Sequence, residues 1–403
     1  MTPLLFLAHR IPYPPNKGDK IRSWNILRYL AERYSVHLGC FIDDEEDRAH
    51  TGVLQELCES CHFAPLDARA ARLRGLPGLL RGDPITLGYY RDRGLARWVR
   101  ETVSRAAIGH VFAFSSAMAQ YALDGPAAAA RRVIDFVDVD SDKWRQYAAA
   151  KRWPESRIYG REARTLLGFE RRVAAAFDVS LFVSEAEAAL FRSLAPESAD
   201  RIAALKNGVD VDYFDPSRAY PNPFDGPGPA LVFTGAMDYW ANVDAVDWFA
   251  RDVLPAIRAV HADAAFHIVG AKPAQQVRAL SALPGVQVTG RVADVRPFVA
   301  HAAISVAPLR LARGVQNKVL EAMAMARPVL ATPEALEGID AVPGQEVFRA
   351  SGADGLSRAA LEMLARNDLA SVGAAARDCV VSGYGWSACL NGLNKFLDDG
   401  ALR

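Results

Sequence analysis

Short apolar runs alternate with amphipathic stretches along almost the whole chain, and this alternation restricts the fold more than any other feature of the sequence. Each run is nearly continuous, which is typical of parallel strands that are covered on both faces of a sheet. The predicted strands are 4–8, 36–42, 110–114, 132–137, 179–183, 230–234, 265–269, 286–289, 304–307 and 328–331. Helical patterns lie between them, for example over 21–34, 162–176, 243–260 and 316–325. The alternation predicts an α/β protein with doubly wound sheets.

A stretch without periodicity divides the strands into two series. Residues 207–228 contain four prolines and little apolar patterning, as expected of a linker. We therefore predict an N-terminal Rossmann-like domain over 1–208, a linker over 209–228 and a C-terminal Rossmann-like domain over 229–383. Residues 384–403 are predicted to form a C-terminal helix that packs back on the N-terminal domain. Because ligands bind at the carboxyl ends of such strands, we expect the two domains to face a central cleft.

The charge balance and the cysteines limit the class of protein. Lys and Arg together number 47, as do Asp and Glu, so the net charge is zero. A dedicated nucleic-acid binder usually has a basic excess, so no nucleic-acid partner is expected. No apolar stretch approaches the roughly 20 residues of a membrane span, and the start of the chain lacks the basic segment of a signal peptide. Five cysteines form an odd, sparse set, which fits a reducing cytoplasm.

Residues 58–62 form a cysteine motif that also occurs in haem-binding proteins. Cys58, Cys61 and His62 form the C-x-x-C-H pattern of c-type haem attachment. Haem attachment requires export, and a zinc site would need a second pair of ligands at a suitable spacing, which the sequence lacks. We predict an incidental junction between a helix and a strand at this position.

The segment 304–332 carries the densest set of polar side chains after a predicted strand. The strand ends at Ala307, and the following loop and helix carry Arg310, Arg313, Asn317, Lys318 and Glu321. The last three share roughly one helix face near its N-terminus, where free N–H groups favour anions. With the nearby arginines, this face would cradle a diphosphate, and Glu321 would accept hydrogen bonds from a ribose diol. A surface Glu–Lys pair is the alternative.

This segment resembles the signature of the retaining GT-B glycosyltransferases of family 4. In that family a pair of glutamates flanks a phosphate-binding helix that continues into EAMA-x-G-x-PV, and this chain has EAMA at 321–324 and ARPV at 326–329. Similar pieces follow in the family's order, namely NGVD at 207–210, FTGAMDYWAN at 233–242, IVG at 268–270, VTGRV at 288–292 and YGWS at 384–387. The runs RIPYPPNKGDKIR at 10–22 and DFVDVDSDKW at 135–144 are similar to sugar transferases associated with bacterial exopolysaccharide and PEP-CTERM systems.

The resemblance implies a GT-B fold, a nucleotide-diphosphate sugar as donor, and neither a metal nor another cofactor. The donor contacts that it implies are Gly235, Gly270, Val292, Arg310, Asn317, Lys318 and Glu321. The first glutamate of the family pair is replaced by Arg313, and Ala236 and Ala241 stand where the family often has Arg and Lys to hold the diphosphate. We therefore expect Arg313 and Lys318 to supply the positive charge and to act catalytically.

The loop after the first predicted strand is expected to contact a ligand. It contains Arg10 and Gly18, and in the family's fold a glycine here lets the backbone approach the donor phosphates or the acceptor, because glycine has no Cβ. Arg10 and Gly18 are accordingly predicted in an acceptor or phosphate loop. A plain turn from a strand into a helix is the alternative.

Four aspartates between 135 and 142 cluster after the predicted strand 132–137. An EF-hand calcium loop is excluded because its glycine and glutamate positions are not filled. A carboxylate at this strand end would orient or deprotonate an acceptor hydroxyl. Asp138 is predicted for this catalytic role, with Asp140 next, and helix capping by Asp142 or Ser141 is the alternative.

The stretch 67–105 is strongly basic. It holds nine arginines against four acidic residues, with Leu73, Leu76, Leu79 and Leu80 interleaved. Such a stretch suits an anionic membrane surface, where a lipid-linked acceptor would lie. A solvated arginine-rich face is the alternative.

Together these features predict a cytoplasmic hexosyltransferase, in peripheral contact with the inner face of the plasma membrane. It would move a sugar from a nucleotide-diphosphate sugar to a saccharide or lipid-linked saccharide acceptor in exopolysaccharide biosynthesis, with retention of configuration. The rival interpretations are a non-catalytic GT-B module that binds nucleotide sugar or polysaccharide, and a sugar-nucleotide epimerase on the same fold.

Overall fold

The computed structural model describes residues 1–312 and 314–398 and divides into two compact units. Unit 1 comprises Met1–Lys206 and Leu390–Arg403, and unit 2 comprises Asn207–Cys389. Residues 209–228, predicted as a linker, therefore belong to unit 2. Their start is held there because the backbone of Val209 pairs with Gly385 in an isolated bridge, and the Val209 N–H donates to Tyr384 O at 2.7 Å.

Unit 1 contains a seven-stranded parallel sheet in the order β3-β2-β1-β4-β5-β6-β7. Its strands are β1 (Thr2–Ala8), β2 (Tyr34–Ile42), β3 (Ser60–Pro65), β4 (His110–Phe114), β5 (Arg131–Val137), β6 (Val179–Phe182) and β7 (Ile202–Ala204). The five predicted strands of this half are confirmed. The sequence did not indicate β3 or β7, which are the edge strands: β3 is largely half-exposed and β7 has only three residues.

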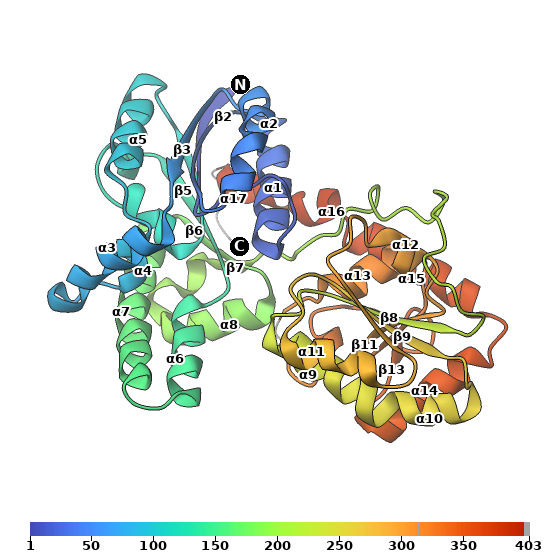
Figure 1. Cartoon of the computed structure of the whole chain (residues 1–403). Coiled ribbons are helices and arrows are strands. Elements are labelled where there is room, and N and C mark those ends of the chain that lie inside the picture. The colour runs from blue at the N-terminus through green and yellow to red at the C-terminus, as the bar shows by residue number, and fades with distance from the viewer. Residues whose placement is uncertain (313, 399–403) are drawn as a thin grey trace. The chain divides into compact units, whose positions relative to one another are not determined.

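Helices cover both faces of this sheet (Figure 1). They are α1 (Gly18–Ala31), α2 (Thr51–Leu57), α3 (Ala68–Arg81), α4 (Ile85–Tyr89), α5 (Arg93–Arg105), α6 (Asp140–Ala150), α7 (Glu155–Ala176) and α8 (Glu185–Leu194). The helix predicted over 21–34 ends earlier, because Tyr34 already pairs with Thr2 as the first residue of β2. Cys58 follows α2 directly and Ser60 opens β3, so the predicted helix-to-strand junction at the C-x-x-C-H motif is confirmed.

Unit 2 contains a six-stranded parallel sheet in the order β10-β9-β8-β11-β12-β13. Its strands are β8 (Ala230–Thr234), β9 (Ala265–Val269), β10 (Val286–Gly290), β11 (Ile304–Ala307), β12 (Val329–Ala331) and β13 (Phe348–Arg349). All five predicted strands are confirmed, and only the two-residue edge strand β13 was not predicted. The doubly wound α/β class predicted from the alternation of apolar runs is therefore correct for both units.

The helices of unit 2 surround this second sheet (Figure 1). They are α9 (Trp240–Trp248), α10 (Leu254–Val260), α11 (Gln275–Ala279), α12 (Arg296–Ala300), α13 (Asn317–Ala324), α14 (Gly352–Leu364) and α15 (Leu369–Gly383). The helix predicted over 243–260 is interrupted by a π-helical turn at Phe249–Val253. Pro255 in the first turn of α10 explains the interruption, because proline lacks the N–H that a continuous α-helix would need there.

The C-terminal segment differs from its prediction. Instead of one helix it forms α16 (Trp386–Leu390) and α17 (Leu393–Leu397), separated at Gly392. The second of these lies on unit 1, where Arg131 Nε of β5 donates to Phe396 O at 3.0 Å. Among the described helices, none is long and apolar enough to cross a membrane.

Candidate functional site

The carboxyl ends of β8, β9 and β10 lie so close together that the residues directly after β8 and β9 have to be glycines. A Cβ on Gly270 would lie 1.7 Å from Gly235 O, and a Cβ on Gly235 would lie 2.8 Å from Asn242 Nδ2. The Gly235 N–H also donates to Val269 O, and the Gly270 N–H to Gly290 O. Both glycines, predicted as donor contacts, therefore have a packing role that is independent of any ligand.

Lys318 projects from the first turn of α13 toward these strand ends. Its Nζ donates to Asn242 Oδ1 at 2.9 Å and lies 4.9 Å from the centroid of the Phe233 ring. Asn242, which is 5% exposed, also donates from Nδ2 to Ala236 O at 2.9 Å. Burial lowers the pKa of Lys318 to about 8, against the opposing effect of Glu321. Asn242 thus holds the ammonium group against the loop that follows β8.

Glu321 lies one turn further along α13, on the same helix face as Lys318. Burial raises the pKa of Glu321 to about 7, and the charge of Lys318 counteracts that effect. Tyr213 lies near Glu321: its pKa is raised by burial, by Asp294 and to a smaller extent by Glu321. The guanidinium of Arg296 lies 3.9 Å from the centroid of the Tyr213 ring and pairs with Asp294.

Arg310 and Val292 were also predicted as donor contacts, but in the structure each of them has a partner within unit 2. Arg310 is exposed and forms a two-pronged ion pair with Asp244 of α9, with Nε 2.9 Å from Oδ2. A donor contact from Arg310 would have to compete with this carboxylate. Val292 packs against a small cluster formed by Val232, Val269 and Ala302, which gives it a core role.

Asn317 and Arg313 are the other two site residues that were predicted in unit 2. Asn317 begins α13, and its Oδ1 is buried without a hydrogen-bond partner among the described residues. Arg313 lies outside the described residues. Of the predicted set, the structure therefore brings Lys318 and Glu321 together on one helix face and adds Asn242, which contacts Lys318.

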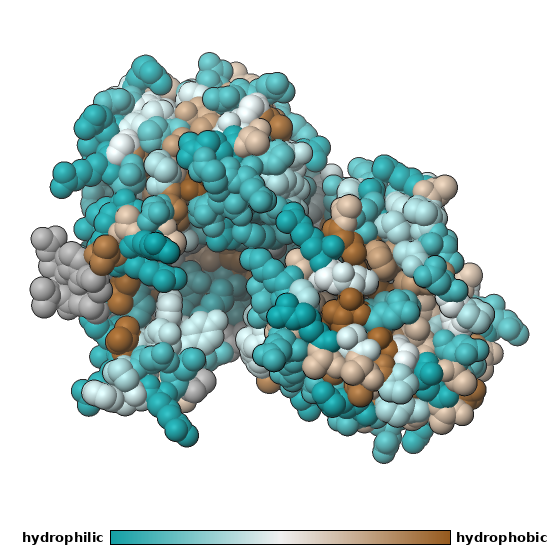
Figure 2. Space-filling view, viewed as in Figure 1, coloured by the Kyte–Doolittle hydropathy of each residue, from teal (hydrophilic) through white to brown (hydrophobic). Residues whose placement is uncertain are grey.

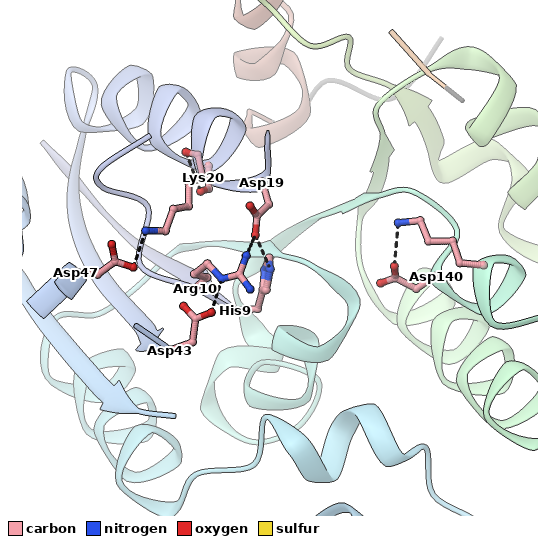
Figure 3. A network of polar contacts seen from close by, with 9 residues as sticks. His9, Arg10, Asp19, Lys20, Asp43, Asp47 and Asp140 are labelled. Carbon is pink, nitrogen blue, oxygen red and sulfur yellow. Dashed lines mark hydrogen bonds and ion pairs between the residues drawn. The ribbon is translucent and has the colours of Figure 1, made fainter. Parts of the chain in front are cut away.

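In unit 1 a polar network lies at the end of β1 (Figure 3). Arg10 donates from Nε to Asp43 Oδ2 at 2.8 Å and from Nη1 to Asp19 Oδ2 at 2.6 Å. His9 Nε2 lies 3.3 Å from the same Asp19 oxygen. Burial alone would raise the pKa of Asp19, but His9 and Arg10 outweigh it and hold that pKa well below its usual range. Arg10 therefore forms ion pairs with two carboxylates, and Lys20 forms an ion pair with Asp47 beside them.

Gly18 stands in contrast to Gly270. It is the first residue of α1, it is exposed, and a Cβ there would have no heavy atom within 4 Å. No packing within the described residues requires glycine at this position. The predicted ligand loop and the plain strand-to-helix turn both remain compatible with this geometry.

Asp138 follows a strained turn at the end of β5. Val137 has a φ of 70°, a conformation that is costly for a β-branched residue. Asp138 Oδ2 lies 2.8 Å from Lys143 Nζ. Lys143 Nζ also lies 3.3 Å from Asp140 Oδ1, and Asp140 Oδ2 accepts from Ser116 Oγ at 3.1 Å. Asp138 is partly exposed but neutralised by a lysine that the sequence analysis did not select.

The alternative of helix capping by Asp142 or Ser141 is wrong: the N-cap residue of α6 is Val139, and a carboxylate from another helix accepts from the first turn. Glu170 of α7 is fully buried, and its Oε1 accepts from the N–H of Ser141 in the first turn of α6 at 3.2 Å. Burial raises the pKa of Glu170 to about 8, and Asp140 adds to the effect. The capping carboxylate therefore comes from another helix, and only the tertiary fold brings it there. Among the described residues, no group of three metal-ligating side chains gathers.

The comparisons with known proteins agree with this architecture. Residues 228–366 match the family model described as glycosyl transferases group 1. A comparison with curated protein sequences gives no significant match. Among solved structures, a glycosyltransferase from Rickettsia africae aligns over 99% of this chain and 99% of its own, with 14% identity and a TM-score of 0.66.

Two further structures show the same likeness. WaaG, a glycosyltransferase involved in lipopolysaccharide biosynthesis, aligns over 98% of this chain and 100% of its own, with 15% identity and a TM-score of 0.65. Anabaena Alr3699/HepE, solved in complex with UDP-glucose, aligns over 98% of this chain and 99% of its own, with 14% identity and a TM-score of 0.66. At these identities the likeness establishes the fold alone. The chain thus has the GT-B fold, and its residues 228–366 match the family model of the group 1 glycosyltransferases.

Proposed function

We propose that this protein transfers a hexose from a nucleotide-diphosphate sugar to a saccharide or lipid-linked saccharide acceptor, with retention of configuration, in exopolysaccharide biosynthesis. The observation that carries the proposal is the ammonium of Lys318, held by Asn242 at the strand ends of the group 1 domain, one helical turn from Glu321. A structural neighbour, HepE, has been solved with UDP-glucose, and this supports a nucleotide sugar as donor. Retention and the exopolysaccharide role rest on the sequence resemblance.

In the proposed reaction, Lys318 stabilises the negative charge that develops on the leaving nucleoside diphosphate. The sequence-based expectation that Arg313 assists it remains part of the proposal. Glu321 accepts hydrogen bonds from the ribose hydroxyls. Asp138 of unit 1 orients or deprotonates the acceptor hydroxyl. To reach it, the acceptor shares the Asp138 carboxylate with Lys143 or displaces Lys143 from that carboxylate.

The test is a calorimetric panel of UDP-, GDP-, ADP- and dTDP-sugars, followed by transfer assays with the donor that binds. NMR of the product's anomeric proton decides between retention and inversion. Binding without transfer or hydrolysis would favour the non-catalytic module. That alternative is supported by Ala236 and Ala241, which stand where related proteins often carry cations, and by the commitment of Arg310 to Asp244.

The pH dependence of donor binding follows from two opposing groups. Glu321, with a pKa of about 7, accepts ribose hydrogen bonds best when ionised, so affinity should rise as the pH passes upward through that value. Lys318, with a pKa of about 8, loses its charge as the pH rises further, so affinity should then fall. Calorimetry across this range should give a maximum between the two values. Glu321→Gln should remove the acidic limb and weaken binding by about 1–3 kcal/mol, and an unchanged profile would exclude Glu321 from the donor site.

Asn242 is proposed as a positioning residue for Lys318. Asn242→Ala should lower kcat about ten- to a hundredfold, because the ammonium loses a charge-assisted hydrogen bond that fixes it. Asn242→Asp keeps the acceptor and adds a negative charge, so it should raise the pKa of Lys318 and move the alkaline limb of the pH profile upward. If the Asn242→Asp profile coincided with that of the wild type, Asn242 would have only a structural role in the loop after β8.

The acceptor side is tested by Asp138→Asn, which should lower kcat while leaving donor affinity near the wild-type value. Asp200→Asn is the matched control, because Asp200 is an exposed aspartate of the same unit. Loss of donor affinity with preserved turnover in Asp138→Asn would contradict the assignment.

A further inference from the structure

The hairpin formed by α6 and α7 carries three aromatic rings that the reaction proposed above does not use. They belong to Trp144 and Tyr147 of α6 and to Tyr159 of α7, and we call them the aromatic cluster. The Trp144 ring centroid lies 5.9 Å from that of Tyr147 and 5.3 Å from that of Tyr159, and the two tyrosine centroids are 6.4 Å apart. Tyr147 is 47% exposed, and the other two rings are half-buried.

The contact between the two helices leaves one flank of α6 open. A Cβ on Gly160 of α7 would lie 3.8 Å from Ala148 Cβ, so Ala148 marks the side of α6 that faces α7. At 100° per residue, Asp140 and Tyr147 lie within about 20° of each other on one flank of that side, with Lys143 beside them. All three are half-buried or exposed. The open flank therefore runs from the charged groups at the end of β5 to the aromatic cluster.

The outer part of the hairpin extends beyond the hydrophobic core of unit 1. In α7 the buried core side chains are Leu166, Phe169 and Val173, which follow Tyr159 in the chain. Of the aromatic cluster, only Trp144 packs against this core. In Figure 2 the surface of the hairpin, at the lower left, is mostly teal and pale with isolated brown residues. Core packing therefore does not explain the two tyrosines, and this view of the hairpin shows no broad apolar patch.

The polar edges of the aromatic cluster are unused. Neither tyrosine hydroxyl forms a hydrogen bond with a described residue, and neither does the indole N–H of Trp144. A pyranose ring fits such a surface, because its C–H groups pack against the negative face of an aromatic ring and its hydroxyls bond polar groups at the ring edge. A purely apolar ligand would cover these polar groups without bonding them, which costs free energy. The cluster is therefore better suited to a sugar than to an apolar chain.

We propose that the aromatic cluster binds a saccharide chain whose terminal sugar lies at Asp138, so that the acceptor is an oligosaccharide. Asp140 and Tyr147 are seven residues apart on one helix, which corresponds to about 10 Å along its axis. Two linked pyranose rings fill such a length. The enzyme would then lengthen an existing glycan rather than attach the first sugar to a carrier. This inference rests on the proposed function for the role of Asp138, whereas saccharide binding by the cluster does not depend on it.

The experiment is a titration of the full chain with glucose, mannose and galactose and with their di- and trisaccharides, without any sugar nucleotide. Saturation-transfer NMR reports which sugar protons contact the protein, and ¹⁵N spectra follow the indole N–H of Trp144, assigned with Trp144→Phe. At least one di- or trisaccharide should bind about tenfold more tightly than its monosaccharide and shift the Trp144 signal. The proposal is overturned if no di- or trisaccharide binds, or if the monosaccharide binds equally tightly.

Variants of Tyr147 test whether the aromatic cluster is the binding surface. Tyr147→Ala should weaken binding of that saccharide about tenfold, because the exposed ring is lost. Tyr147→Phe should weaken it less, because only the hydroxyl is lost. Trp153→Ala is the matched control: Trp153 is 77% exposed in the same hairpin and has no ring contact with a described residue, so this variant should bind like the wild type. Equal losses in Tyr147→Ala and Trp153→Ala would overturn the proposal.

The bland alternative is that the aromatic cluster only holds the two helices together. Thermal unfolding of each variant tests it. If Tyr147→Ala lowers the melting temperature but binds the saccharide like the wild type, the cluster serves the hairpin alone and the proposal fails.

Failure of this inference can be told apart from failure of the proposed function. In transfer assays, Tyr147→Ala should raise the acceptor KM and leave donor affinity unchanged. Saccharide binding that Tyr147→Ala weakens, without transfer from any donor, would support the aromatic cluster and contradict the transferase. Transfer to a monosaccharide that Tyr147→Ala does not affect would support the transferase and overturn the role of the cluster.

Discussion

Lys318→Ala is expected to lower kcat by about two to three orders of magnitude, provided that the donor is a nucleotide-diphosphate sugar. The N-terminus of α13 alone contributes only about 0.3–1 kcal/mol toward binding an anion when exposed. A preorganised cation acting on charge that develops in the transition state is worth about 3–4 kcal/mol. Lys318 is such a cation, because its Nζ is already fixed by Asn242 and lies over the Phe233 ring.

The control for this experiment is Lys395→Ala, which removes an exposed lysine of unit 1 and should leave kcat unchanged. Lys318→Met keeps most of the side-chain volume without the charge, so it distinguishes lost electrostatics from lost packing. Single-turnover kinetics with saturating donor would report the chemical step directly. If Lys318→Met turned over like the wild type, the leaving diphosphate would have to be stabilised by other groups.

The fold was predictable because its central strands are continuous apolar runs. Strands such as β1 and β8 are buried on both faces, and burial of this kind leaves a strong signal in the sequence. The edge strands β3, β7 and β13 were not predicted, because a short or half-exposed strand needs few apolar residues. The C-terminal segment was predicted as one helix, since the interruption at Gly392 leaves the apolar spacing on either side intact.

The candidate site was only partly predictable, because its contacts join residues that are far apart in the chain. Lys318 and Glu321 are neighbours through helical spacing, which a sequence displays. Asn242 contacts Lys318 across 76 positions, and no local pattern indicates that pairing. The ion pair of Arg310 with Asp244, 66 positions away, was missed for the same reason. Lys143 is close to Asp138 in the chain, but their pairing depends on the turn between β5 and α6, which the sequence pattern does not specify.

A buried ion pair also supports the turn that presents Asp138. Arg22 of α1 is 1% exposed and Asp135 of β5 is fully buried. The Arg22 Nε donates to Asp135 Oδ2 at 2.7 Å, and Nη2 donates to Oδ1 at 3.2 Å. The same Oδ1 accepts from the N–H of Val137 at 3.0 Å. The pair therefore connects α1 to β5 and fixes the strained residue that directly precedes Asp138.

Arg22→Met should destabilise unit 1 by about 3–5 kcal/mol, because it leaves the buried Asp135 carboxylate without a compensating charge. The double variant Arg22→Met/Asp135→Asn should recover much of this loss, since no buried charge remains and the amide oxygen can still accept from Val137.

Arg171→Met is the matched control, because Arg171 forms an exposed ion pair with Glu197 in the same unit. Exposed pairs contribute little, so the unfolding midpoint of this variant should not move. Urea unfolding and native-state hydrogen exchange of unit 1 measure these differences. If Arg22→Met unfolded at the same urea concentration as Arg171→Met, the carboxylate of Asp135 would have to be protonated in the native protein, and the turn before Asp138 would be held by the backbone of β5 rather than by the ion pair.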